Sequence, residues 1–211
     1  MTGLQIMERV QGEKGRVAFR FENGVEMTLY RSELHGLSAV EQQCLREGET
    51  VSDELYQKLL DEVVGLRAKK RAMHLLEQMD RTERQLYDKL KQGGYPEPCI
   101  EQAIAYVKGF HYIDDLRYAR CFVRSRQSRR SMGRIRTDLL RRGVARDTIE
   151  QALAEEYDAD ERATIRAIIE KRHYDCGTAD EREQRRMYQF LLRRGYRGSD
   201  ILRVLRCAGE Y

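Results

Sequence analysis

The side chains of this sequence whose types and spacing could carry chemistry are mostly arginines. Eleven arginines lie between residues 117 and 146 beside a single acid, Asp138, so this segment has a net charge of +10 in a chain of formal net charge +4. Arginine makes charge-assisted, bidentate hydrogen bonds to phosphates and carboxylates. Because the segment has too few acids to pair its arginines, a surface for a polyanion or an acidic protein is favoured over a solvated face with local ion pairs.

Helical periodicity places these arginines on ordered surfaces. Leu116, Ala119 and Val123 have the spacing of one helix face, and the arginines at 117, 120 and 124 repeat that spacing on another face. Ten arginines form the candidate binding surface, called here the central basic face: Arg117, Arg120, Arg124, Arg126, Arg129, Arg130, Arg134, Arg136, Arg141 and Arg142. A sequence-specific DNA-binding protein is less well supported. The helix around Arg134 has no Asn or Gln to read adenine, and its density of arginine suits phosphates better than base edges.

Catalysis is the main alternative use of the polar residues. A nuclease or another phosphoryl-transfer enzyme needs clustered acids for metal ions or a glycine-rich phosphate loop. Asp114-Asp115 is the one prominent acidic pair, and a helix N-cap followed by a favourable first-turn charge explains it better. The four histidines lie in different predicted elements without ligand spacing. We therefore expect no catalytic residue, no metal ion and no cofactor.

The composition narrows the class of protein. Charged residues make up 35% of the chain and Trp is absent, as is typical of a helix-rich protein, and the periodic apolar residues argue against disorder. The five cysteines are dispersed and lack a Cys-x-x-Cys pair, which predicts reduced thiols. No uncharged run approaches the roughly 20 residues of a membrane span, and the first residues do not resemble a signal peptide. These features predict a cytoplasmic protein with no membrane partner.

Residues 1–66 form an acidic segment with a net charge of −5. Apolar and polar residues alternate in the second of three predicted strands, 5–10, 16–21 and 25–30. Asn23-Gly24 is a two-residue hairpin turn between the last two strands. Ser52 is a candidate N-cap for a helix that runs to about Leu66. We predict a small structural domain with a short antiparallel β-sheet that packs against helices.

From residue 67 onward one pattern occurs three times. In each copy two apolar residues four apart are followed by a glycine four residues later and an isoleucine six residues after the glycine. The glycines are Gly94, Gly143 and Gly195, so the copies are 49 and 52 residues apart. This pattern predicts an amphipathic helix that ends at a left-handed glycine and is followed by a second helix.

A further helix is predicted before each of these pairs, at residues 68–79, 114–127 and 160–173. Thr82-x2-Gln85 and Thr178-x2-Glu181 resemble capping boxes at the starts of middle helices. The predicted fold is therefore mainly α, with three tandem three-helix repeats that form an elongated curved array behind the small N-terminal β-sheet domain. The predicted boundaries are 1–66 for the N-terminal domain, then 67–109, 110–158 (the basic repeat) and 159–211.

Two stretches of the second repeat carry a family signature. The first is Tyr112-Ile-Asp-Asp-Leu-Arg-Tyr-Ala-Arg, and the second is Gly133-Arg-Ile-Arg-Thr-Asp-Leu-Leu-Arg-Arg-Gly-Val. Together on a threefold repeat they resemble the RecX family of bacterial regulatory proteins. Phe110-His111 stands where that family usually has a glycine before the tyrosine, a departure that concerns the turn. The similarity covers residues 67–211, and the strand-rich leader resembles the extra domain of longer members.

The resemblance implies a non-enzymatic regulator without cofactors. Such proteins bind the RecA recombinase filament on DNA and reduce its ATPase, strand-exchange and co-protease activities, which act in homologous recombination, DNA repair and the SOS response. The residues themselves leave an alternative, a DNA-binding protein that contacts phosphates through its basic central repeat. The implied partners are the RecA filament and single-stranded or double-stranded DNA, contacted directly or through the filament by a monomer.

Overall fold

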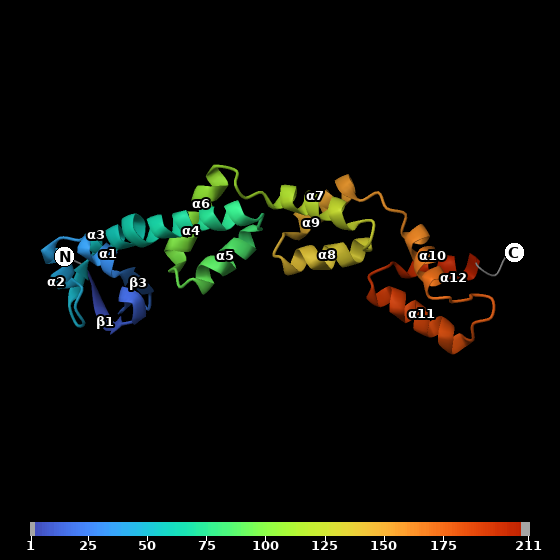
Figure 1. Cartoon of the computed structure of the whole chain (residues 1–211), viewed down its shortest axis with the longest axis horizontal. Coiled ribbons are helices and arrows are strands. Elements are labelled where there is room, and N and C mark those ends of the chain that lie inside the picture. Colours follow the sequence, from blue (N-terminus) through green and yellow to red (C-terminus); the bar gives the residue numbers. More distant parts are fainter. Residues whose placement is uncertain (1–2, 208–211) are drawn as a thin grey trace. The chain divides into compact units, whose positions relative to one another are not determined.

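The computed structural model describes residues 3–207, and the chain divides into two compact units, one ending at Asp114 and one beginning at Asp115 (Figure 1). Helices dominate both units, and strands occur near the N-terminus. The predicted fold class, mainly α with three three-helix repeats behind a small antiparallel sheet, is confirmed. The elongated curved arrangement of the repeats stays a prediction.

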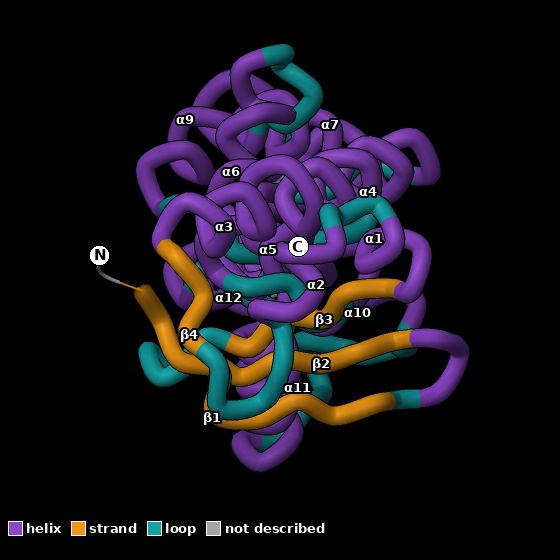
Figure 2. Tube along the Cα trace, turned by 90° about the vertical axis from the view of Figure 1, so that its left-hand side faces the viewer, coloured by secondary structure: helices purple, strands orange, loops and turns teal. Residues whose placement is uncertain are grey.

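The sheet has four antiparallel strands in the order β3-β2-β1-β4 (Figure 2). The strands are β1 (Gly3–Gln11), β2 (Arg16–Phe21), β3 (Glu26–Tyr30) and β4 (Thr50–Ser52), with a short 3-10 turn, Glu13–Gly15, between the first two. The three predicted strands are confirmed, and Gly24 takes a φ of 78° in the hairpin turn between β2 and β3. The fourth strand was not predicted, because three residues are too few to show an alternating pattern.

The sheet and the first repeat share one hydrophobic core. Buried and exposed residues alternate along β2, which places Val17, Phe19 and Phe21 in that core together with the buried face of the first repeat. The helices α1 (Arg31–His35) and α2 (Ala39–Cys44) follow β3. Ser52 caps α3 (Asp53–Lys58) as predicted, because its Oγ accepts a hydrogen bond from the Leu55 amide at 3.3 Å.

The helix that starts at α3 does not end near Leu66. It continues through a π-helical segment, Leu59–Val64, into α4 (Gly65–Gln78), so the predicted helix end near Leu66 is wrong. Leu59, Leu60 and Val64 are buried in the shared core. Residues 59–66 are largely apolar, whereas four of the five residues that follow are basic, and this change in composition resembles a helix boundary although the helix continues through it.

The first repeat contains α4, α5 (Glu83–Gln92) and α6 (Glu97–Gly109). The capping box at the start of α5 is confirmed, because Thr82 and Gln85 exchange two hydrogen bonds of 3.2 Å between side chain and backbone amide. Gly94 follows α5 with a φ of 76°. A side chain at this φ would be strained, which explains why a glycine ends the helix.

The second unit contains two repeats, each with a core of its own. The second repeat comprises α7 (Asp115–Arg126), α8 (Met132–Arg141) and α9 (Arg146–Glu156), and the third comprises α10 (Glu161–Lys171), α11 (Glu181–Arg193) and α12 (Gly198–Cys207). The predicted capping box at Thr178 is wrong. Asp180 caps α11 instead, with Glu183 as its reciprocal partner, and Thr178 donates a hydrogen bond to Asp175.

The second and third repeats meet through a close backbone contact. A Cβ atom added to Gly133 in α8 would lie 2.4 Å from the carbonyl oxygen of Gly195, so only glycine fits there. Beside this contact the Ser131 hydroxyl donates a hydrogen bond of 2.6 Å to the Arg194 carbonyl oxygen. The Met132 amide donates a second hydrogen bond, of 2.7 Å, to the Glu161 carboxylate. These contacts fix the two repeats of the second unit against each other.

Candidate functional site

The central basic face lies on α7, on α8 and on the turn between them. Of its members, Arg117, Arg124, Arg126, Arg129, Arg134 and Arg141 are exposed, and the remaining four are half-buried. The last helix of the repeat, α9, packs beside α7. The acids of α9 lie outside the segment of residues 117–146 whose charge we counted, and they change the electrostatics of the face.

Three acids of α9 pair with arginines of the central basic face. Arg120 pairs with Glu155, and Arg124 Nε lies 3.1 Å from Glu156. Arg136 donates two hydrogen bonds, of 2.5 and 2.8 Å, to the two carboxylate oxygens of Glu150. The premise that local acids are too few to pair these arginines is therefore only partly right. The charge count over residues 117–146 did not include the acids of α9, which follow this segment in the sequence but pack beside its arginines.

Two of these ion pairs, those of Glu150 and Glu155, lower the pKa of the carboxyl group. The hydrogen bond from Arg120 lowers the pKa of Glu155, and that from Arg136 lowers the pKa of Glu150. The same contact raises the pKa of Arg136. Such solvent-exposed pairs contribute only about 0–1 kcal/mol each to stability. An anionic partner can therefore replace the α9 carboxylates as the ligand of these arginines at little energetic cost to the fold.

A second group of arginines surrounds the buried carboxylate of Asp138. Arg130 pairs with this carboxylate, and Arg134 Nε lies 3.3 Å from its other oxygen. Arg142 donates a hydrogen bond of 2.8 Å to the Asp138 backbone carbonyl. This acid, the one counted within the arginine-rich segment, thus holds arginines from both ends of α8. Its burial makes it a structural anchor for the face.

An aromatic side chain organises two further arginines. The guanidinium carbon of Arg142 lies 4.6 Å from the ring centroid of Phe122, and that of Arg126 lies 5.8 Å from it. Cation–π attraction of this kind contributes about 0.5–1 kcal/mol at exposed sites. The structure therefore brings seven of the ten predicted arginines into three groups, at α9, at Asp138 and at Phe122, and Arg142 belongs to the last two of these groups. The other three, Arg117, Arg129 and Arg141, lie at exposed positions.

The acidic pair that could have held a metal ion lies at the start of α7. Asp115 is the first residue of this helix and Asp114 precedes it, in the position predicted for an N-cap. Among the described residues, no three His, Cys, Asp or Glu side chains converge on one point. Within the same residues, no helix is both long and apolar enough to cross a bilayer.

Four cysteines have described side chains, and each is a free thiol: Cys44, Cys99, Cys121 and Cys176. The side chain of Cys207 lies outside the described residues. Cys99 is fully buried in the shared core and its Sγ contacts the Leu60 carbonyl oxygen at 3.3 Å. Burial raises the pKa of this thiol to about 11. Cys99 is therefore a neutral core residue near pH 7.

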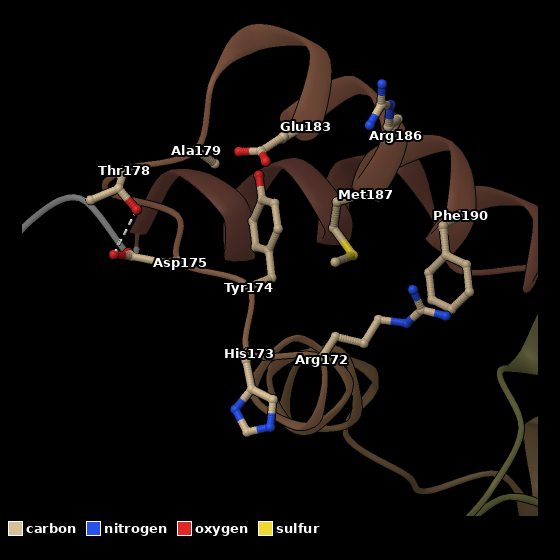
Figure 3. A pocket seen from close by; sticks show the side chains of 10 residues that line it. All are labelled: Arg172, His173, Tyr174, Asp175, Thr178, Ala179, Glu183, Arg186, Met187 and Phe190. Carbon is tan, nitrogen blue, oxygen red and sulfur yellow. Dashed lines mark hydrogen bonds between the residues drawn. The ribbon is translucent and has the colours of Figure 1, made fainter.

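The third repeat holds a basic site that sequence reasoning missed. The guanidinium carbons of Arg172 and Arg194 lie 3.8 and 4.5 Å from the ring centroid of Phe190. A neighbouring cavity of about 440 Å³ is lined by Arg172, Phe190, Arg186 and Tyr174 among others (Figure 3). The spacing of Phe190 on α11 and Arg194, which follows that helix four residues later, was a visible signal. It was overlooked because the near-neutral charge of the whole repeat hid it.

Comparison with known proteins places each repeat in one family. The family model for the first three-helix domain of RecX matches residues 68–106. The models for the second and third three-helix domains match residues 114–153 and 159–205. "Regulatory protein RecX" of Caldanaerobacter subterraneus is 32% identical over 163 residues, covering 76% of this chain and 80% of that protein. "Regulatory protein RecX" of Vibrio campbellii is 36% identical, covering 67% and 90%.

Two solved structures have a similar fold. The "Crystal structure of regulatory protein RecX" aligns with a TM-score of 0.61 at 22% identity, covering 95% of this chain and 98% of that one. The "Crystal structure of RecX from Lactobacillus salivarius" aligns with a TM-score of 0.57 at 20% identity, covering 69% and 96%. At these identities the structures support the fold alone.

Proposed function

Because this chain belongs to the RecX family of regulatory proteins, we propose that it binds the RecA recombinase filament on DNA and restrains it. Filament-coupled ATP hydrolysis, strand exchange and co-protease activity then fall as a consequence of binding. The proposal makes the chain a cytoplasmic regulator that catalyses no reaction itself. The observation that carries it is the combination of three family repeats with a dense arginine surface on the second one.

The geometry of the central basic face supports this role. Arg120, Arg124 and Arg136 are held in extended positions by carboxylates of α9 that remain partly exposed. A filament of protein on nucleic acid presents both carboxylates and phosphates, and arginine binds either in a bidentate manner. Exchange of one carboxylate for another anion then changes the partner of the guanidinium and leaves the displaced carboxylate, which is partly exposed, to be hydrated.

Direct binding of DNA through the central basic face is the second candidate. Phosphate contacts fix the position of a protein on nucleic acid without reading its sequence, and arginine is well suited to them. The observation in its favour is the exposure of Arg129 and Arg141, which project from the turn and from the end of α8. The two candidates can be distinguished by measuring whether the chain binds DNA when no recombinase is present, because only direct binding predicts that it does.

The test is co-sedimentation of the chain with RecA filaments on single-stranded DNA. The variant Arg117→Ala, Arg120→Ala, Arg124→Ala should bind filaments more weakly and inhibit ATP hydrolysis less, and added salt should weaken binding by the parent steeply. Exposed substitutions of this kind usually change stability by less than about 0.5 kcal/mol each. The fold should therefore stay intact, as circular dichroism would verify.

The matched control removes three exposed arginines elsewhere, as Arg20→Ala, Arg84→Ala, Arg166→Ala. Each of these arginines also pairs with one carboxylate, so the control has the same net charge as the central variant and likewise removes arginines that form ion pairs. It should restrain the recombinase nearly as well as the parent. Equal inhibition by the parent and the central variant would show that the recombinase contact lies elsewhere.

A further inference from the structure

Two guanidinium groups are held on one aromatic ring in the third repeat. Arg172, which follows α10, and Arg194, which follows α11, come from different helices and meet at Phe190. Among residues 3–206, whose side chains are described, neither arginine forms an ion pair. The negative face of the ring offsets part of the repulsion between the two cations. The site therefore holds two positive charges within 4.5 Å of the centroid of one ring.

The same arginine pair occurs in the second repeat. Arg126, Arg142, Arg172 and Arg194 each lie three residues after the last buried residue of their helix, so the pairs occupy equivalent positions. The ring, by contrast, comes from the first helix in the second repeat and from the middle helix in the third. The arginines are thus the repeated element, and each repeat supports them with a different ring. The first repeat has Gly93 at one of these positions.

The surroundings of the pair in the third repeat leave it available to an outside anion. Arg172 extends over Phe190 at the rim of the 440 Å³ cavity, and Tyr174 points toward Glu183 (Figure 3). The two acids that line this cavity are engaged locally. Asp175 accepts hydrogen bonds from the Gly177 amide and the Thr178 hydroxyl, and Glu183 accepts one from the Asp180 amide.

We infer that Arg172 and Arg194 form a clamp for a phosphate group of a nucleic-acid strand, and that Arg126 and Arg142 form the equivalent clamp one repeat earlier. Two guanidinium groups that share one ring can both donate hydrogen bonds to the oxygens of a phosphodiester. A nucleic-acid strand carries such a group at every nucleotide, so equivalent clamps in consecutive repeats can contact one strand at two points. This inference rests on direct binding of nucleic acid, the second candidate above, and deepens it by adding a contact in the third repeat and by naming the chemical group that is bound.

The test is fluorescence anisotropy of the full chain with a labelled single-stranded oligonucleotide in the absence of recombinase. The variant Arg172→Ala, Arg194→Ala should bind about tenfold more weakly or worse. The slope of log affinity against log salt should fall by about 0.7, the value for the one phosphate of a single strand that the variant no longer neutralises. The matched control is Arg182→Ala, Arg203→Ala, which removes two exposed charges of the same repeat away from Phe190. Its affinity should fall by less than about threefold.

A second variant separates the clamp from simple charge and from misfolding. Arg172→Lys, Arg194→Lys keeps both charges but lacks the planar fork, so it should bind several-fold more weakly than the parent while melting at the same temperature. Parental affinity in the lysine variant, or an equal fall in affinity in the alanine variant and its control, would overturn the clamp. An alanine variant that no longer binds poly-L-glutamate but binds the oligonucleotide as the parent does would also overturn it, in favour of an acidic protein partner.

Discussion

The contact between Gly133 and Gly195 provides a sharp test of how the second and third repeats are joined. Gly133 lies inside α8, where alanine is ordinarily the better residue by about 1 kcal/mol. In this position a Cβ would lie 2.4 Å from the Gly195 carbonyl oxygen, whereas ordinary contacts begin near 3.4 Å. Gly133→Ala therefore requires the two repeats to separate by about an ångström or the α8 helix to shift.

The size of the effect follows from two opposing contributions. Overpacking of a well-packed contact costs about 1–3 kcal/mol. Separation of the repeats would also weaken the hydrogen bonds that Ser131 and Met132 donate to the third repeat, each contributing about 0.5–1.5 kcal/mol. Against the gain of about 1 kcal/mol in helix propensity, Gly133→Ala should lower the free energy of unfolding of the second unit by about 1–5 kcal/mol, with the upper end reached if both hydrogen bonds are lost.

The assay is urea denaturation followed by circular dichroism, together with hydrogen exchange of the Met132 amide. The control is Gly109→Ala at the end of α6, where an added Cβ meets no atom within 4 Å. This control should be neutral or stabilise the chain by up to about 1 kcal/mol. If Gly133→Ala is as stable as the control, and its Met132 amide is equally protected, the backbone contact does not join the repeats.

The remaining predictions concern the cores of the two units. Leu139→Ala removes a fully buried side chain from the second repeat and should cost about 2–5 kcal/mol in a melting experiment; an unchanged melting temperature would contradict its place in the core. Cys99 should resist iodoacetamide at pH 8 in the native chain while exposed Cys121 reacts, as mass spectrometry can measure. Because burial raises the pKa of Cys99 to about 11, its thiol contributes stability that is full below its unfolded pKa and decreases as pH rises toward 11. Replacement of Cys99 by alanine should abolish this alkaline component; if the decrease persists unchanged, other groups cause it.

Local features of the fold were predictable from sequence. Thr82 and Gln85 lie three residues apart and satisfy each other, so their capping box could be read directly. The same pattern misled at Thr178, because Asp180 also has an acid three residues later and the turn at Asp175 occupies the threonine. Two overlapping capping patterns compete for one helix start, and only the structure decides between them.

Contacts between helices were not predictable in this way. Glu155 lies 35 residues from Arg120, so a count of charges along a short segment could not include it. The contact of Arg172 with Phe190 also joins separate helices, and the charge total of the third repeat concealed it. Net charge over a segment measures the average field, whereas binding depends on which guanidinium groups have acids beside them. That neighbourhood is set by helix packing.

Because the sheet and the first repeat share one core, the chain should tolerate truncation differently at its two ends. A terminal repeat needs a cap over its apolar side, and here the four-stranded sheet and the π-helical residues Leu59, Leu60 and Val64 share one core with the first repeat. Truncation at residue 62 would cut the continuous helix inside its π-helical segment and uncover this core. Removal of the third repeat would break the contacts around Gly133, Ser131 and Met132 and leave the separate core of the second repeat in place. Trimming from the C-terminal end should therefore leave folded protein, whereas trimming from the N-terminal end removes the cap on which the first repeat depends.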